Sequence, residues 1–218
     1  MFVSIIVPTY NEAANIPLLV ARIKKAMRRR KDYEILVADD DSPDRTWEIA
    51  EQLGAPVRVL RRTSRARGLA PAVFDAFKIA RGDILGVIDA DLQHPPEKIP
   101  ELLAALEAGA HISVGSRLVT GGSVESWPRH RRFTSYFATI LSRPITSVKD
   151  PMSGFFFLRK PVLVGMSLSP RGYKILLEIL GRCSYSSVVE VPILFRDRSV
   201  GGSKLTWKVQ FEYLEQLF

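Results

Sequence analysis

Short apolar runs alternate with longer amphipathic segments through the first half of this chain. Runs of a few apolar residues bounded by turn residues are typical of buried strands, whereas apolar positions at helical spacing are typical of helices that pack by one face. The pattern predicts strands, with a helix in each interval, at residues 3–8, 34–38, 57–60, 84–88 and 112–116. Such alternation predicts an α/β fold, a mostly parallel sheet with helices on both faces.

The alternation fades after residue 117. The residues that follow, up to 153, are rich in Arg, Ser, Gly and Pro, which indicates functional loops around one helix. From here to the C-terminal part of the chain, the pattern predicts a helix at 133–141, a strand at 155–158, a helix at 173–182 and an edge strand or hairpin at 188–195.

The apolar run at 84–88 ends in two carboxylates, Asp89 and Asp91, which are followed by Gln93 and a pair of prolines. Burying a carboxylate is costly, so these side chains must project from the strand end into solvent or onto a cation. A hard divalent ion such as Mg²⁺ or Mn²⁺ takes oxygen ligands and commonly retains substrate phosphates in its shell. We interpret the motif as a bridge between the protein and a diphosphate. The alternative is a turn in which both aspartates only cap backbone groups.

Other polar residues also follow predicted strands. Tyr10 and Glu12 come after the first strand, and Asp39 begins a run of three aspartates after the second. We expect Ser42 to cap the next helix and Pro43 to be its first residue. Ligands of parallel sheets bind beyond the carboxyl ends of the strands, so these residues should converge with the two later aspartates. Acidic groups that converge repel each other unless a cation intervenes, which favours a ligand site.

Composition narrows the class of protein. The chain has 218 residues, 46% hydrophobic and 25% charged, as expected for one large globular α/β domain. A formal net charge of +8 favours an anionic partner, which could be a nucleic acid, an anionic membrane or a phosphorylated substrate. The single cysteine, Cys183, excludes an internal disulfide, and we expect it to pack inertly. We expect neither a signal peptide nor a membrane-spanning run, because residues 2–8 already form a core strand and later apolar runs are short.

Six segments occur in an order and at a spacing that resemble family-two glycosyltransferases of the GT-A fold. Within that family they resemble the dolichol-phosphate (polyprenol-phosphate) mannose synthases, and the resemblance covers essentially the whole chain. One departure is Asp41, where the family more often has Asn or Gly, and we expect it to be tolerated. The segments are residues 7–12, 39–44, 67–70, 89–96, 150–156 and 198–205.

The resemblance implies a Rossmann-like catalytic domain at residues 1–203, with a nucleotide-binding half at 1–116 and an acceptor-binding half at 117–203. It implies inverting transfer of mannose from GDP-mannose, or another nucleotide sugar, to a polyprenyl or dolichyl monophosphate, with Mg²⁺ or Mn²⁺ as cofactor. A UDP-glucose-dependent polyprenyl-phosphate glucosyltransferase and a soluble, polysaccharide-building member of family two are the alternatives.

The resemblance also implies roles for individual residues. The expected metal ligands are Asp89, Asp91 and Gln93, and the expected catalytic residues are Asp89, Asp91 and Arg117. The expected acceptor-phosphate contacts are Arg117, Arg131, Ser135 and Lys174. The expected nucleotide-sugar contacts are Pro8, Tyr10, Glu12, Val37, Asp39, Asp89, Gln93 and Arg198. We assign His94 and His111 to packing.

Two other classes of protein fit less well. A sugar nucleotidyltransferase would show a glycine-rich, basic loop after its first strand, where this chain has Thr9-Tyr10-Asn11-Glu12. A nucleic-acid-binding module would explain the charge, but no such motif is recognisable and aromatic residues are not interleaved with the basic runs. We expect no nucleic-acid partner.

The last residues form an amphipathic stripe in which Trp207, Phe211, Leu214 and Phe218 share one helical face. A stripe of this kind is ordinarily buried against the core. Because the implied acceptor is a lipid, we instead expect residues 204–218 to form a helix at the membrane surface. This places the protein at the cytoplasmic face of a membrane, and we expect the native protein to continue into, or pair with, membrane-spanning segments.

Overall fold

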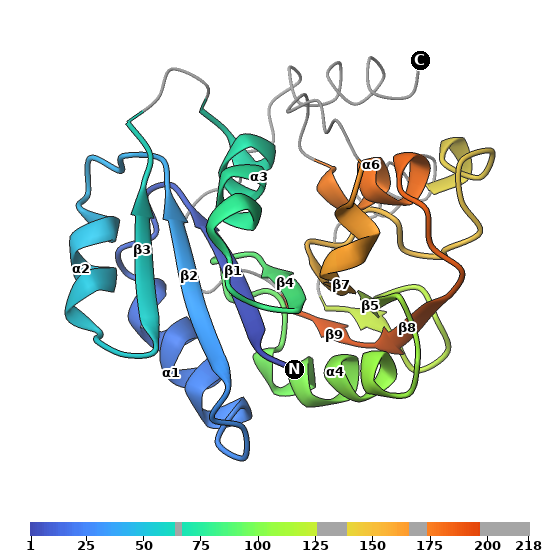
Figure 1. Ribbon diagram of the computed structural model, residues 1–218, viewed down its shortest axis with the longest axis horizontal. Coiled ribbons are helices and arrows are strands. Elements are labelled where there is room, and N and C mark those ends of the chain that lie inside the picture. The colour runs from blue at the N-terminus through green and yellow to red at the C-terminus, as the bar shows by residue number, and fades with distance from the viewer. Residues whose placement is uncertain (64–66, 126–138, 166–173, 197–218) are drawn as a thin grey trace.

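A seven-stranded sheet forms the centre of the computed structural model (Figure 1). The structure describes residues 1–63, 67–125, 139–165 and 174–196. Its strands are β1 (Val3–Thr9), β2 (Tyr33–Asp39), β3 (Val57–Arg61), β4 (Ile84–Ile88), β5 (Ile112–Ser116), β6 (Ser123–Val124), β7 (Phe155–Arg159), β8 (Val188–Pro192) and β9 (Leu194–Phe195). Its α-helices are α1 (Ile16–Ala26), α2 (Thr46–Gln52), α3 (Leu69–Ile79), α4 (Ile99–Glu107) and α6 (Ile175–Arg182), and the 3₁₀ helices are η1 (Pro96–Lys98) and η2 (Lys160–Leu163).

The strand order β3-β2-β1-β4-β7-β5-β8 confirms a mostly parallel sheet. Strands β1 to β4 are mutually parallel where they pair, and β5 pairs parallel with β8 at the edge. Strand β7 lies antiparallel between β4 and β5 and is the exception. The predicted edge strand around Pro192 is therefore confirmed, and β9 forms a separate two-stranded sheet with β6.

Helices cover both faces of the sheet, as predicted. One core lies between the sheet and α1, α2 and α4, and the other lies between the sheet and α3 and α6. Alternate strand residues supply the two cores: Phe155 and Phe157 face the first, whereas Phe156 and Leu158 face the second. This alternation follows from the period-two geometry of a strand and explains why strands buried on both faces appear as continuous apolar runs.

The prediction that Ser42 caps the second helix is wrong. Helix α2 begins at Thr46, after Arg45 in a left-handed conformation with φ 61°. The Ser42 hydroxyl instead donates to Asp39 Oδ2 at 2.7 Å and accepts from the amide of Asn11 at 3.0 Å. Arg45 is the N-cap residue and makes no side-chain capping bond, while Asp44, one residue earlier, accepts from the Thr46 amide through Oδ1 at 3.0 Å. Gly54 follows the helix end with φ 60°, a left-handed conformation that favours glycine.

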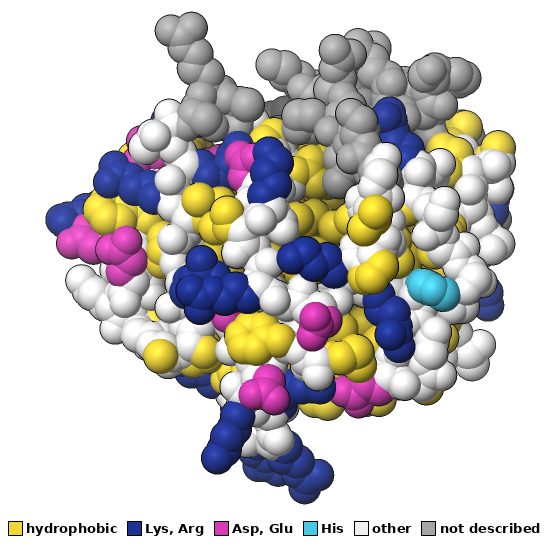
Figure 2. Space-filling model, viewed as in Figure 1, with side chains coloured by type: hydrophobic (Ala, Val, Ile, Leu, Met, Phe, Trp, Pro, Cys, Tyr) yellow, Lys and Arg dark blue, Asp and Glu magenta, His cyan; other side chains and the backbone are white. Residues whose placement is uncertain are grey.

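Two predicted segments lie wholly or partly outside the described residues. The helix expected at 133–141 is described only from residue 139, and the amphipathic segment 204–218 is not described. Among the described helices, none has both the length and the hydropathy to span a membrane. On the face shown in Figure 2, Lys and Arg side chains are spread out with acidic side chains between them. The net charge therefore does not by itself locate an anion-binding site on this face.

At the opposite end of the sheet from the acidic motif, Glu34 joins three parts of the chain. Its Oε1 accepts from the Ser4 hydroxyl at 2.6 Å and from the Arg81 amide at 2.9 Å, and its Oε2 pairs with Arg58 at 2.5 Å. Burial alone would raise the pKa of Glu34, but these hydrogen bonds and the Arg58 charge outweigh it and hold the pKa below the ordinary value.

We expect Glu34→Gln to lower the free energy of unfolding at pH 7 by about 1–3 kcal/mol, because a buried charged acceptor is lost. A lowered folded-state pKa means that the charged form stabilises the fold above the ordinary pKa of glutamate, and that this stabilisation is lost as pH falls through the folded-state pKa. The difference between the wild type and the variant should therefore shrink in acid. Urea unfolding across pH checks this, with the exposed Glu107→Gln as control. A difference that stayed constant with pH would contradict it.

Candidate active site

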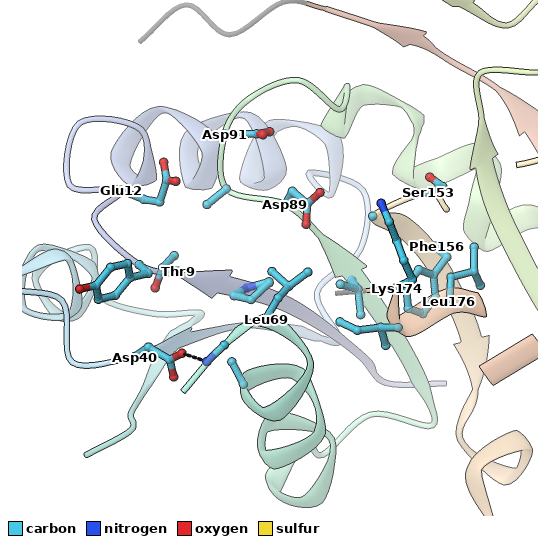
Figure 3. A pocket seen from close by; sticks show the side chains of 18 of the residues that line it. Thr9, Glu12, Asp40, Leu69, Asp89, Asp91, Ser153, Phe156, Lys174 and Leu176 are labelled. Carbon is cyan, nitrogen blue, oxygen red and sulfur yellow. Dashed lines mark hydrogen bonds between the residues drawn. The ribbon is translucent and has the colours of Figure 1, made fainter. Parts of the chain in front are cut away.

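A cavity of about 590 Å³ opens at the carboxyl ends of β1 and β4 (Figure 3). The loops after these strands contribute to it, as do the loop before β7 and the first turn of α6. Predicted site residues that line the cavity are Pro8, Tyr10, Glu12, Asp89, Asp91 and Lys174. The structure thus brings together residues from 8 to 174 of the chain at the sheet edge where parallel strands end.

The two aspartates differ in their surroundings. Asp91 is 9% exposed, and its Oδ1 accepts from the Gln93 amide at 3.2 Å, so it performs the turn-capping that was the alternative interpretation. Asp89 follows β4 directly, and its Oδ1 is buried without a hydrogen-bond partner in the described structure. A buried carboxylate oxygen without a donor is costly, and a bound cation would relieve that cost. Asp89 therefore favours the cation interpretation.

The donor set fits a divalent cation that is shared with a substrate. Within the described residues, no cluster of three or more His, Cys, Asp or Glu side chains could hold a metal on its own. Two carboxylates that leave most of the shell to phosphates and water are the usual arrangement for Mg²⁺. In Figure 3 Asp89 lies between Glu12 on one side and Lys174 on the other, with Asp91 above it.

Gln93 ties the acidic loop to the end of β9. Its side-chain Nε2 donates to the Arg196 carbonyl at 3.0 Å, and its own carbonyl accepts from the Arg196 amide at 3.0 Å. The amide oxygen Oε1 is the atom suited to a metal, so Gln93 stays a predicted ligand. Arg198, which is also a predicted nucleotide-sugar contact, lies outside the described residues.

The two predicted nucleotide contacts from β2, Val37 and Asp39, are buried inside the protein. Val37 lies fully buried within β2. Asp39 is also fully buried, and it accepts from the Thr9 hydroxyl at 2.8 Å and from the Ser42 amide and hydroxyl at 2.8 and 2.7 Å. This carboxylate fastens the end of β1 to the end of β2. Both residues lie outside the cavity lining, and their nucleotide contacts stay predictions.

Asp40 lines the cavity instead, and sequence reasoning missed it. It pairs with the buried Arg62, which also contacts Asp75 at 3.0 Å, and it accepts from the amide of Gly68 at the start of α3. The network holds the residues before α3 against the cavity. The alternation of side chains along β2 could have revealed this, because it directs neighbouring aspartates toward opposite faces of the sheet.

Arg117 forms a buried ion pair. Its Nε and Nη2 donate to Asp150 at 2.7 and 2.6 Å, its backbone amide donates to the same carboxylate at 2.9 Å, and its guanidinium lies 5.2 Å from the ring centre of Phe195. The side chains of Arg117 and Asp150 are 9% and 1% exposed. Arg117 is absent from the cavity lining and stays a predicted acceptor contact, while Arg131 and Ser135 lie outside the described residues.

Comparison with known sequences confirms the resemblance carried by the motifs. The profile of glycosyl transferase family 2 matches residues 4–165. A dolichol-phosphate mannosyltransferase from Pyrococcus furiosus is 51% identical over 224 residues, an alignment that takes in all of this chain and 63% of that protein. A polyprenol monophosphomannose synthase from Mycolicibacterium smegmatis is 39% identical over 216 residues, covering 93% of this chain and 80% of that protein.

Comparison with solved structures confirms the GT-A type fold. A glucosyl-3-phosphoglycerate synthase from Mycobacterium tuberculosis, in complex with Mn²⁺, UDP-glucose and phosphoglyceric acid, has a TM-score of 0.71 and 19% identity, over 99% of this chain and 77% of that one. A mannosyltransferase from Pyrobaculum calidifontis, in complex with GDP-Man and Mn²⁺, has a TM-score of 0.62 and 20% identity, over 90% of this chain and 56% of that one.

We expect Asp150→Ala to lower the free energy of unfolding by about 3–5 kcal/mol, because it leaves the Arg117 charge buried without its partner. Glu97→Ala is the matched control: it removes the partner of Arg22 from a pair whose carboxylate is 56% exposed, and such pairs contribute about 0–1 kcal/mol. Denaturant unfolding of both variants measures the two values. Equal, small losses would show that Arg117 does not depend on Asp150.

Proposed function

This chain is a member of glycosyl transferase family 2, and we propose that it transfers mannose from GDP-mannose to a polyprenyl monophosphate. The observation that carries the proposal is the pair Asp89 and Asp91 at the end of β4, facing a cavity that can hold a nucleotide sugar. The relatives named for mannose transfer to dolichol or polyprenol phosphate support the choice of sugar and acceptor.

Asp89 and Asp91 would hold Mg²⁺ or Mn²⁺, with Gln93 as a third predicted ligand. When bound, the ion neutralises the charge that grows on the departing nucleoside diphosphate. Pro8, Tyr10 and Glu12, which line the cavity, would contact the nucleotide. Asp40, which also lines the cavity, joins this set of proposed donor contacts.

The reaction needs little acid–base chemistry. An acceptor phosphate oxygen forms the new bond to the anomeric carbon as the bond to the diphosphate breaks, so the nucleoside diphosphate leaves with the electron pair and the configuration inverts. The acceptor phosphate is already an anion near neutral pH and requires no general base. The protein must instead bring two anions together. Lys174, at the start of α6 and in the cavity lining, would reduce their repulsion.

The acceptor lipid implies a place in the cell. We propose that the enzyme works at the cytoplasmic face of a membrane, where the polyprenyl chain stays in the bilayer and only its phosphate enters the cavity. The predicted surface helix at 204–218 and the acceptor contacts Arg131 and Ser135 remain part of this proposal. A membrane-spanning continuation or partner subunit would strengthen the attachment.

Transfer of labelled mannose from GDP-mannose to polyprenyl phosphate in detergent, with Mn²⁺ or with chelator, tests the proposal. We expect transfer with the ion and none with chelator. Asp91→Ala should lower the rate by at least about 100-fold, since each 1.4 kcal/mol of lost transition-state stabilisation is about tenfold. Asp32→Ala, an exposed aspartate at the other end of the sheet, should leave the rate unchanged.

Two results would contradict the proposal. Transfer that persisted in excess chelator, or in Asp91→Ala at the wild-type rate, would exclude the metal role. Transfer of glucose from UDP-glucose, but not of mannose from GDP-mannose, would assign the chain to the glucosyltransferase alternative.

A further inference from the structure

The position of the Asp89 carboxylate is set by contacts rather than by hydrogen bonds. Oδ1 has no hydrogen-bond partner in the described structure, and Oδ2 lies 3.6 Å from Nε2 of His94, beyond hydrogen-bond length. Gly154 lies against the same carboxylate from the loop before β7. A carboxylate binds a cation well only if its position is fixed in advance. His94 and Gly154 are the two neighbours that restrict the position of the Asp89 carboxylate.

Gly154 is required by space and not by backbone conformation. Its φ is outside the left-handed region that favours glycine, so any L-residue could adopt its backbone. A Cβ at this position, however, would lie 2.1 Å from Asp89 Oδ2 and 2.6 Å from Asp89 Cγ. Ser153 fixes the loop, since its hydroxyl donates to the Gly115 carbonyl at 2.7 Å and accepts from the Phe155 amide at 3.2 Å. The carboxylate therefore occupies the volume that a side chain at 154 would fill.

His94 is held rigidly beside the same carboxylate. Its side chain is 2% exposed, and its ring packs against Phe155 at 5.5 Å and edge-on against Phe195 at 4.9 Å between ring centres. Its Nδ1 is buried without a hydrogen-bond partner in the described part of the chain, which is unfavourable. An apolar ring would pack here without that cost. What the imidazole adds is the second nitrogen, Nε2, which faces Asp89.

We propose that Gly154 and His94 are positioning residues that fix the Asp89 carboxylate for the divalent cation, Gly154 by leaving it room and His94 by directing Nε2 at Oδ2. This inference rests on the proposed metal-dependent transfer. It extends the site to two residues that act through Asp89, of which Gly154 also lines the cavity. Loss of a group that orients a metal ligand typically weakens metal binding about 10–100-fold.

Binding of Mn²⁺ in the presence of GDP, followed by electron paramagnetic resonance of the free ion, separates this role from general packing. Gly154→Ala and His94→Phe should each weaken Mn²⁺ binding about 10–100-fold. His94→Phe keeps an aromatic ring between Phe155 and Phe195 but removes the nitrogens. His94→Gln should recover much of the affinity, because its amide nitrogen can occupy the place of Nε2. GDP binding without the ion should be unchanged in all three variants.

Matched controls exist for both substitutions. In Gly181→Ala the new Cβ would lie near a methyl group of Ile145, within helix α6 and away from Asp89. His111→Phe removes the imidazole that contacts Ser186 and Ser187. Both controls should bind Mn²⁺ like the wild type, and thermal unfolding of every variant verifies the fold.

The outcomes separate the inference from the function on which it rests. If the wild type does not bind Mn²⁺ with GDP, the proposed metal-dependent function fails, and the positioning role with it. If the wild type binds the ion and both Gly154→Ala and His94→Phe bind it equally well, only the positioning role is overturned. Should Gly154→Ala fail to fold, the comparison of His94→Phe with His94→Gln decides: equal losses in both would leave His94 a packing residue.

Discussion

The arrangement of this molecule depends on the cost of placing carboxylates at the end of a buried strand. All five residues of β4 are buried, and Asp89 and Asp91 follow it within three positions. Two carboxylates this close repel each other, and one oxygen of Asp89 is buried without a donor in the described structure. A bound divalent cation would reduce the repulsion between the two carboxylates and would also give the buried Asp89 oxygen a partner. The loops after β1 and before β7 and the start of α6 surround the place where such an ion and its diphosphate would lie.

Three arginines of the described structure form ion pairs with carboxylates that are nearly buried. Arg62 pairs with Asp40, Arg117 with Asp150 and Arg58 with Glu34, and in each pair the carboxylate is nearly buried. Arg58 stabilises the end of the sheet away from the cavity. Arg62 fixes the residues before α3, and Arg117 holds Asp150 in the segment before β7. Among the described residues, Arg67 and Lys174 are the basic side chains in the cavity lining, and together with the proposed metal they would oppose the repulsion between donor and acceptor phosphates.

The sequence predicts the strands and the acidic edge because each depends on local pattern. The five predicted apolar runs form β1 to β5. Strand β1 pairs parallel with β2 and β4, so the carboxyl ends of these strands lie together. Longer-range pairings were beyond such reasoning. The sequence does not say that Arg117 meets Asp150, 33 residues away, or that Asp40 rather than Asp39 lines the cavity. A run of three aspartates does not say which of them faces the cavity. That is set by the strand alternation, by the contact of Asp39 with Ser42 and by the pairing of Asp40 with Arg62. The start of α2 differs from the prediction because the Ser42 hydroxyl bonds Asp39 and Asn11, and the chain turns through the left-handed Arg45 before the helix begins.

The central claim is that the end of β4 holds a divalent cation together with a nucleoside diphosphate. Crystals grown with Mn²⁺ and GDP, measured at a wavelength where manganese scatters anomalously, test it most directly. The account predicts one strong anomalous peak within bonding distance of carboxylate oxygens of both Asp89 and Asp91, at about 2.0–2.3 Å, and in contact with the diphosphate. A GDP molecule bound in the cavity with no anomalous peak at these two aspartates would contradict it.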